Sequence, residues 1–352
     1  MLASIQIRSI ASAFVVLCSS VASGAIMKLD HILFPIDFSE HCRALNGEVE
    51  WLANRSGCRV TLLHVFEVPA TWYGGFEAPM VELEPFGRIS AEAKKKLSGY
   101  SINVPESQVT RVLAQGEAAW HIAGWANLHD VDLVVMGTHG CGTVRGLLLG
   151  SVAAKVLHDV NCPVWTQSLA HELPSAVPHG VTSIVCALEL TEEAPPLLSF
   201  TQGLAKYFGA KVRVVHSVPE AETRPNKYFD SDLHRYLSES ARVDLAKLQR
   251  QAGTDFPLTI GASGIAKEVA RAAKEEKADL VVIGRGKAKE SFARIRTHAY
   301  EIIHEAPCPV LSYAVNQQAR ISSSYSEERL SQFGADAQPP IDSRTSSLEL
   351  RR

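Results

Sequence analysis

An internal repeat constrains the fold of this chain more than any other feature of its sequence. The repeated segments keep their order along the chain: VDLVVMG at 131–137 and ADLVVIG at 278–284, NCPV at 161–164 and PCPV at 307–310, LLHV at 62–65 and VVHS at 214–217. Partners lie about 150 residues apart, which is the length of a whole domain. The sequence therefore predicts two tandem domains.

Each copy alternates short apolar runs with longer segments of helical period, which is typical of a parallel sheet with crossover helices. We expect strands at residues 31–35, 60–66, 108–113, 132–136 and 164–167 of the first copy, and at 183–187, 211–216, 257–259, 280–283 and 310–314 of the second. The fold class is therefore α/β, with two doubly wound domains, each a five-stranded parallel sheet flanked by helices.

The pattern also predicts particular helices. In the first copy Ser39 is expected to cap a helix that runs towards Asn54 and ends at Gly57. A later helix is expected to bury an apolar stripe, formed by Ile122, Trp125, Ala126 and Leu128. In the second copy, residues 232–251 are rich in strong helix formers.

The two domains are expected at residues 27–167 and 181–315, joined by a Pro-containing linker at 168–180. Residues 316–352 are rich in Ser, Gln and charge, which predicts a disordered tail. Residues 1–26 admit two interpretations. An apolar run after Arg8 resembles a signal peptide, which would imply secretion or a periplasmic location. We favour a mis-assigned start before Met27 and a cytoplasmic protein.

Composition excludes several classes of protein. The chain has 352 residues, of which 46% are hydrophobic and 21% charged, and a net charge of −3, so neither wholesale disorder nor a polytopic membrane protein fits. With no global basic field, we expect neither nucleic acid nor a membrane as a partner. The 7 cysteines are an odd number without a C-x-x-C pair, which argues against a disulfide framework.

A glycine-rich segment, GTHGCGTVRGLLLGS at residues 137–151, follows a predicted strand and leads into a predicted helix. Glycines let the backbone N–H groups approach an anion, and a helix starting near Ser151 would add its own N–H groups. Nucleotides bind beyond the carboxyl ends of such strands. The alternative is a flexible loop before a helix capped by glycine. The segment is not a Walker A loop, because no G-K-[ST] follows.

The spacing of this segment resembles the universal stress protein family, whose ATP-binding members carry G-x-x-G, nine residues, then G-[ST]. Gly137, Gly140, Gly150 and Ser151 match these positions. The family's P-x-D after the first strand appears at residues 35–37, and its C-P-V before the last strand at 162–164. The resemblance extends from residue 27 to 315 and implies an adenine nucleotide alpha hydrolase-like fold.

The resemblance further implies a binding site for ATP, with or without Mg2+, in the first domain. Asp37 and Val65 would lie near the base and ribose, and Ser151 near the phosphates. Asp37 could instead serve as a carboxylate at a helix N-terminus, and His139 could be a solvent-facing loop residue. The residues implied to surround the nucleotide are Pro35, Asp37, Val65, Met136, Gly137, His139, Gly140, Gly150, Ser151 and Val152.

The second copy departs from this pattern. Glu189 stands in place of the aspartate, the second motif glycine is lost, and Arg296 replaces the third if the loop is one residue shorter. Of the final pair, Thr297 alone keeps a hydroxyl group. An arginine side chain where the backbone must approach phosphates would occupy their space. We therefore expect that the second domain binds no nucleotide.

These features favour an ATP-binding stress regulator with little or no hydrolysis and no catalytic residue, because no acidic pair or nucleophile motif accompanies the glycines. Two alternatives stay open: a nucleotide-free scaffold, and an adenylating or ATP-hydrolysing enzyme of the same superfamily. As in homodimers of the family, the final strands at residues 164–166 and 310–312 would pair into an intramolecular pseudo-dimer. Further homodimerisation and the identity of a protein partner are left open.

Overall fold

The computed structural model describes residues 28–67, 83–139, 149–167, 180–219, 227–285 and 292–315. Within helices at residues 83–86, 227–231 and 292–297 it describes the backbone alone. Gly140, the segment before Met27 and the expected tail therefore lie outside the described residues, as does all of the expected linker except Gly180.

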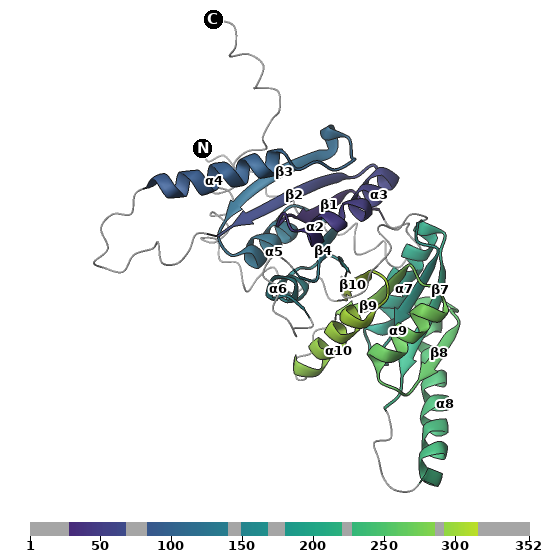
Figure 1. The fold of residues 1–352 in the computed structure, drawn as a ribbon. Helices are drawn as coiled ribbons and strands as arrows, with labels where there is room; N and C mark the ends of the chain where they lie inside the picture. The colour runs from purple at the N-terminus through teal and green to yellow at the C-terminus, as the bar shows by residue number, and fades with distance from the viewer. Residues whose placement is uncertain are drawn as a thin grey trace, which may run out of the picture.

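The first half of the chain contains the five predicted strands with helices between them (Figure 1). Its elements are β1 (His31–Pro35), α2 (Glu40–Ala44), α3 (Asn46–Ser56), β2 (Arg59–Phe66), α4 (Leu83–Ser98), η2 (Glu106–Gln108), β3 (Val109–Gln115), α5 (Ala118–Leu128), β4 (Leu133–Gly137), α6 (Ser151–Asp159) and β5 (Val164–Gln167).

The second half repeats this order, and its long helix α8 extends beyond the sheet (Figure 1). Its elements are β6 (Ser183–Ala187), α7 (Ala194–Phe208), β7 (Lys211–Ser217), α8 (Lys227–Ala252), β8 (Leu258–Gly261), α9 (Ile265–Glu275), β9 (Leu280–Arg285), α10 (Phe292–Glu305) and β10 (Val310–Ala314). The predicted α/β class with two doubly wound halves is confirmed.

The ten strands form one sheet in the order β3-β2-β1-β4-β5-β10-β9-β6-β7-β8. Strands are parallel within each half, and the halves join where β5 and β10 pair antiparallel. We call this junction the seam. In it Leu311 lies opposite Trp165, and both side chains are 1% exposed. The predicted pairing of the final strands is therefore present within one chain.

Side-chain hydroxyls strengthen the seam on both sides of the Trp165–Leu311 pair. Thr166 donates its hydroxyl to the carbonyl of Val310 at 3.1 Å, and Ser312 donates to the carbonyl of Val164 at 3.3 Å. All four of these residues are buried, so the hydroxyls need such partners. Each bond runs from one half of the chain to the other and joins equivalent positions. The seam therefore has pseudo-twofold symmetry.

The sheet is covered on both faces, and each helix layer runs through both halves. Along β1, Ile32 and Phe34 pack against one core and Leu33 against the other, as strand alternation requires. The first core receives α2, α3, α4, α7 and α8, whereas the second receives α5, α6, α9 and α10. Both cores therefore bridge the two halves of the chain.

Two helical predictions need correction. The helix expected from Ser39 to Asn54 is divided at Leu45 into α2 and α3, although Ser39 caps α2 and Gly57 ends α3 with φ +70° as predicted. Leu128 was expected on the buried stripe of α5, yet it is 43% exposed. Six residues after Ile122, it is rotated by about 240° around the helix from that stripe.

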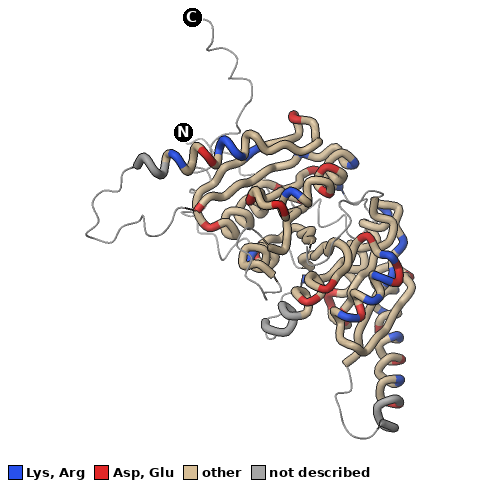
Figure 2. The backbone as a smooth tube through the Cα atoms, viewed as in Figure 1, with Lys and Arg blue, Asp and Glu red and all other residues tan. Residues whose placement is uncertain are grey.

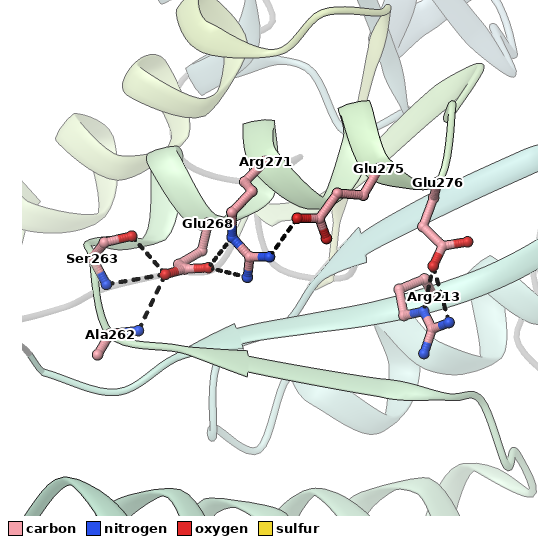
Figure 3. A network of polar contacts seen from close by, with 7 residues as sticks. All are labelled: Arg213, Ala262, Ser263, Glu268, Arg271, Glu275 and Glu276. Atoms are coloured by element: carbon pink, nitrogen blue, oxygen red, sulfur yellow. Dashed lines mark hydrogen bonds and ion pairs between the residues drawn. The ribbon is translucent and has the colours of Figure 1, made fainter. Parts of the chain in front are cut away.

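Glu268, on α9, lies at the centre of a polar network in the second half (Figure 3). Its carboxylate accepts hydrogen bonds from the backbone of Ala262 and Ser263, from the Ser263 hydroxyl at 2.5 Å, and from the Arg271 guanidinium at 2.6 Å. The carboxylate packs directly over Gly261, where any Cβ atom would collide with it. Burial alone would raise the pKa of Glu268, but the bonds from Ser263 and Arg271 hold it at about 2.

We expect Glu268→Gln to lower the free energy of unfolding at pH 7 by roughly 2 kcal/mol, because a charged acceptor is lost from a buried network. The pKa of Glu268 is depressed from 4.5 to about 2, so its contribution is present above pH 4.5 and is lost as pH falls through 2. Urea unfolding at several pH values measures this: the difference between wild type and variant should shrink over that range.

Glu275→Gln is the matched control, because Glu275 binds the same Arg271 at 2.8 Å from an exposed position. Exposed ion pairs contribute less than about 1 kcal/mol. An equal loss of stability in both variants, or a Glu268→Gln difference that does not change with pH, would contradict this account of the network.

Candidate functional site

The predicted site residues gather where the strand order of the first half reverses. β1 lies between β2 and β4, and the chain reaches β2 and β3 on one side before it crosses to β4 and β5 on the other. In folds of this kind, ligands bind beyond the carboxyl ends of the strands at such a reversal, which here are β1 and β4. All predicted site residues except Gly140 are described there, at strand ends and at the start of α6.

The segment after β1 is fixed to β2. The backbone N–H of Ile36 donates to the carbonyl of Leu63 at 2.8 Å, and Nδ1 of His64 lies 2.6 Å from the Ile36 carbonyl. Burial lowers the pKa of His64, so the neutral ring donates from Nδ1. Phe38 adopts φ +62° with its ring 4.5 Å from that of His64. This left-handed conformation is unfavourable for Phe and is held by the surrounding contacts.

Asp37 organises the start of α2. Its Oδ1 atom accepts hydrogen bonds from the Ser39 backbone at 2.9 Å and from the Ser39 hydroxyl at 2.6 Å. The Ser39 oxygen in turn accepts from the backbone N–H of Cys42 at 3.0 Å. These contacts match the alternative interpretation of Asp37 as a carboxylate at a helix N-terminus. Its contact with a nucleotide stays a prediction.

The opposite side of the site is formed by the ends of β4 and α6. The backbone N–H of Gly150 donates to the carbonyl of Thr138 at 2.8 Å, which brings the start of α6 against the end of β4. A Cβ atom on Gly150 would lie 2.9 Å from that carbonyl oxygen, so this approach requires glycine. Thr138 was missed by the sequence analysis, because its contribution is a backbone carbonyl.

The first N–H groups of helix α6 have no acceptor within the helix. The first N–H group bonded within the helix belongs to Ala154, which donates to the carbonyl of Gly150 at 2.9 Å. The N–H groups of Ser151, Val152 and Ala153 precede it and have no acceptor within the helix. Ser151 is exposed and Val152 half-buried, so this helix end is open to an anion.

The remaining predicted residues form the apolar part of the site. Met136 is buried, whereas Val65 and Val152 are half-buried and pack against the second core. Pro35 ends β1 and Gly137 ends β4. His139 is half-buried, and its Nδ1 atom lies 3.0 Å from the Thr138 hydroxyl. The structure thus places these residues around one strand-end position without assigning them a ligand.

The second half has a different helix at the corresponding place. Helices α6 and α10 both end three residues before an equivalent Cys-Pro, but α6 has 9 residues and α10 has 14. The additional turn and a half lies at the N-terminus of α10. Thr297, the counterpart of Ser151, therefore lies inside the helix, where backbone N–H groups are bonded to the preceding turn. The groups that could bind an anion in α6 are already used in α10.

A hollow of about 600 Å³, part of it open to solvent, lies at the strand-order reversal of the second half. Its lining is mostly apolar and includes Leu197, Ile265 and Ile302, and Glu189 and Glu193 also line it. The extended α10 does not offer the free helix end that α6 offers at the corresponding place. That the second domain binds no nucleotide stays a prediction.

Within the described residues, no cluster of three or more His, Cys, Asp or Glu side chains could hold a metal ion. The described helices include none long and apolar enough to cross a membrane. Figure 2 shows acidic and basic positions interspersed along both halves.

The described cysteines are free and buried, at Cys42, Cys58, Cys162, Cys186 and Cys308. Burial raises the pKa of Cys42 to about 11, so its thiol is poorly suited to act as a nucleophile.

Comparison with known proteins agrees with this architecture. A universal stress protein from Thermus aquaticus, encoded in the 3′ region of a QAH/OAS sulfhydrylase, is 34% identical over 136 residues, which are 38% of this chain and 94% of its own. Universal stress protein A homolog 1 of Coxiella burnetii is 32% identical over 144 residues, 39% of this chain and 95% of its own. Each relative has about the length of one half of this chain.

Similarity of fold extends across both halves. The crystal structure of a universal stress protein from Archaeoglobus fulgidus covers 82% of this chain and 100% of its own, with a TM-score of 0.58 and 17% identity. The sequence profile described as Universal stress protein family matches residues 28–166 and again residues 180–313. This chain therefore belongs to the universal stress protein family and carries two tandem copies of its domain.

Proposed function

We propose that the first domain binds an adenine nucleotide, ATP in particular, and that the protein acts as a nucleotide-dependent regulator in the stress response. The observation that carries this proposal is the contact between Gly150 and Thr138, which brings to the strand-order reversal three N–H groups of α6 that have no acceptor within the helix. Family membership supports the same conclusion, because the matching glycines belong to the family's ATP-binding pattern.

The proposed binding mode divides the ligand between two ends of the site. The base and ribose would lie towards Asp37 and Val65, where half-buried apolar surface is available. The phosphates would lie on Gly150, Ser151 and Val152. A helix N-terminus stabilises negative charge through its dipole and its free N–H groups. Mg2+, if it accompanies ATP, would be held mainly by the phosphates, since Asp37 is the single carboxylate among the predicted site residues.

We expect little or no hydrolysis. Phosphoryl transfer requires bound Mg2+ and a group that positions water, and the predicted site residues include no acidic pair for this purpose. The two alternatives give different outcomes. A nucleotide-free scaffold would bind no ATP, and an adenylating enzyme would release pyrophosphate with turnover above about 1 per second.

We also place the protein in the cytoplasm, where thiols stay reduced, because its described cysteines are unbridged.

We expect Ser151→Ala to weaken ATP binding by roughly ten- to a hundredfold, because one hydrogen bond to a charged group contributes about 1.5–3 kcal/mol. Adenosine affinity should barely change, since the nucleoside lies towards Asp37. Calorimetric titration of both ligands measures the two effects. Equal weakening of ATP and adenosine would contradict the placement of phosphates at α6.

We expect Gly150→Ala to weaken ATP at least tenfold, because its Cβ would lie 2.9 Å from the Thr138 oxygen and displace the start of α6. Gly203→Ala in α7 is the control: a Cβ there meets nothing within 4 Å. That substitution should leave ATP affinity unchanged and raise stability by about 0.5–1 kcal/mol. Retention of full ATP affinity by Gly150→Ala would refute the role of this close approach.

A further inference from the structure

Arg285, the last residue of β9 in the second domain, reaches across the seam into the first domain. Its Nη1 donates to the carbonyls of Leu157 and Val160, the latter at 3.3 Å, and its Nη2 donates to the carbonyl of Cys162 at 2.6 Å. These carbonyls belong to the C-terminal end of α6 and to the turn that leads into β5. One guanidinium group therefore holds the C-terminal end of α6, the helix proposed to bind the phosphates at its N-terminal end.

The seam makes this contact possible. Because β5 and β10 are antiparallel, the carboxyl edge of the second half of the sheet lies beside the amino edge of the first. The end of β9 consequently meets the end of α6. A second contact runs in the same direction, from the hydroxyl of Tyr300 on α10 to the carbonyl of Ala154 at 3.4 Å. The two layered helices α6 and α10 are thus connected across the seam.

The last carbonyls of a helix lack donors within the helix, and in α6 three of them accept hydrogen bonds from side chains outside it. Asp159 accepts from the Asn127 side chain at 3.0 Å, whereas Leu157 and Val160 accept from Arg285. A cation at this end also complements the helix dipole, and the planar guanidinium can serve several acceptors at once.

The length of α6 connects this contact with the nucleotide site. A helix of 9 residues at about 1.5 Å per residue is about 13 Å long, so its two ends are joined by a short continuous helical backbone. Its C-terminal end is held by Arg285, and its N-terminal end is pressed against Thr138 through Gly150. A shift at the C-terminal end of α6 would therefore move Ser151 at its N-terminal end. Anion binding depends on the placement of the N–H groups next to Ser151.

The corresponding residue of the first domain is Thr138, which follows Gly137 as Arg285 follows Gly284. Its short side chain stays local, with the hydroxyl 3.0 Å from His139 Nδ1. The long cationic side chain therefore stands in the domain that has lost the nucleotide motif and acts on the domain that keeps it.

We propose that Arg285 is a positioning residue for the phosphate end of the first domain's site, so that docking of the second domain sets nucleotide affinity. The inference rests on the proposed function. Coupling of this kind is reciprocal: nucleotide bound at Ser151 strengthens the attachment of α6 to Arg285.

The test compares Arg285→Ala, Arg285→Lys and the control Arg213→Ala in the full chain. Arg213 is also a second-domain arginine, but it lies on β7 and binds Glu276, at the end of α9, at 3.0 Å. Calorimetry with ATP and with adenosine measures affinity, and amide hydrogen exchange of residues 153–157 measures the opening of α6 without ligand. We expect Arg285→Ala to weaken ATP about five- to tenfold and adenosine less than twofold, with faster exchange in α6.

Arg285→Lys should bind ATP more tightly than Arg285→Ala but less tightly than the unsubstituted protein, because lysine keeps the charge but not the planar guanidinium that serves several carbonyls. Arg213→Ala should change neither nucleotide affinity nor hydrogen exchange in α6. Unchanged exchange in α6, or equal weakening of ATP and adenosine, would overturn the proposal. If the unsubstituted protein binds no ATP, the proposed function fails; the exchange measurement then still decides whether Arg285 holds α6.

Discussion

The antiparallel pairing of β5 with β10 is the contact on which the rest of the structure depends. It buries Trp165 against Leu311 and removes one edge from each half of the sheet, edges that would otherwise be open to other chains. It also joins the two helix layers into cores that extend through the whole chain. Because the pairing is antiparallel, the carboxyl edges of the two halves face opposite ways, and the proposed nucleotide site of the first half is separated from the hollow of the second.

The two copies differ most where they would bind a ligand. In the first, the short helix α6 begins at the glycine contact, and its first N–H groups have no acceptor within the helix. In the second, α10 continues for another turn and a half, and carboxylates border the hollow at the strand ends. The second domain instead supplies Arg285 and Tyr300 to α6. Loss of the motif in one copy thus accompanies support of the other.

The sequence predicted the strands well because buried parallel strands are continuous apolar runs, such as residues 133–136 and 280–283. It also placed Gly150 and Ser151 at a strand-end turn. The break at Leu45 was not predictable, since the apolar period continues through it. Neither were the bonds of Arg285 to α6, because they join residues more than 120 positions apart whose meeting depends on the seam. The role of Asp37 was left open in the sequence analysis, because a carboxylate at this position suits both a nucleotide contact and the N-terminus of a helix.

The central claim is that two paired copies of one fold carry a single nucleotide site, in the first copy. Native mass spectrometry of the full chain titrated with ATP tests it most directly, because it counts bound nucleotides on each molecule. The account predicts one nucleotide per chain at saturation, with Ser151→Ala shifting that single step to higher ATP concentration. Two equivalent binding steps, or a single step that Ser151→Ala leaves unchanged, would contradict it.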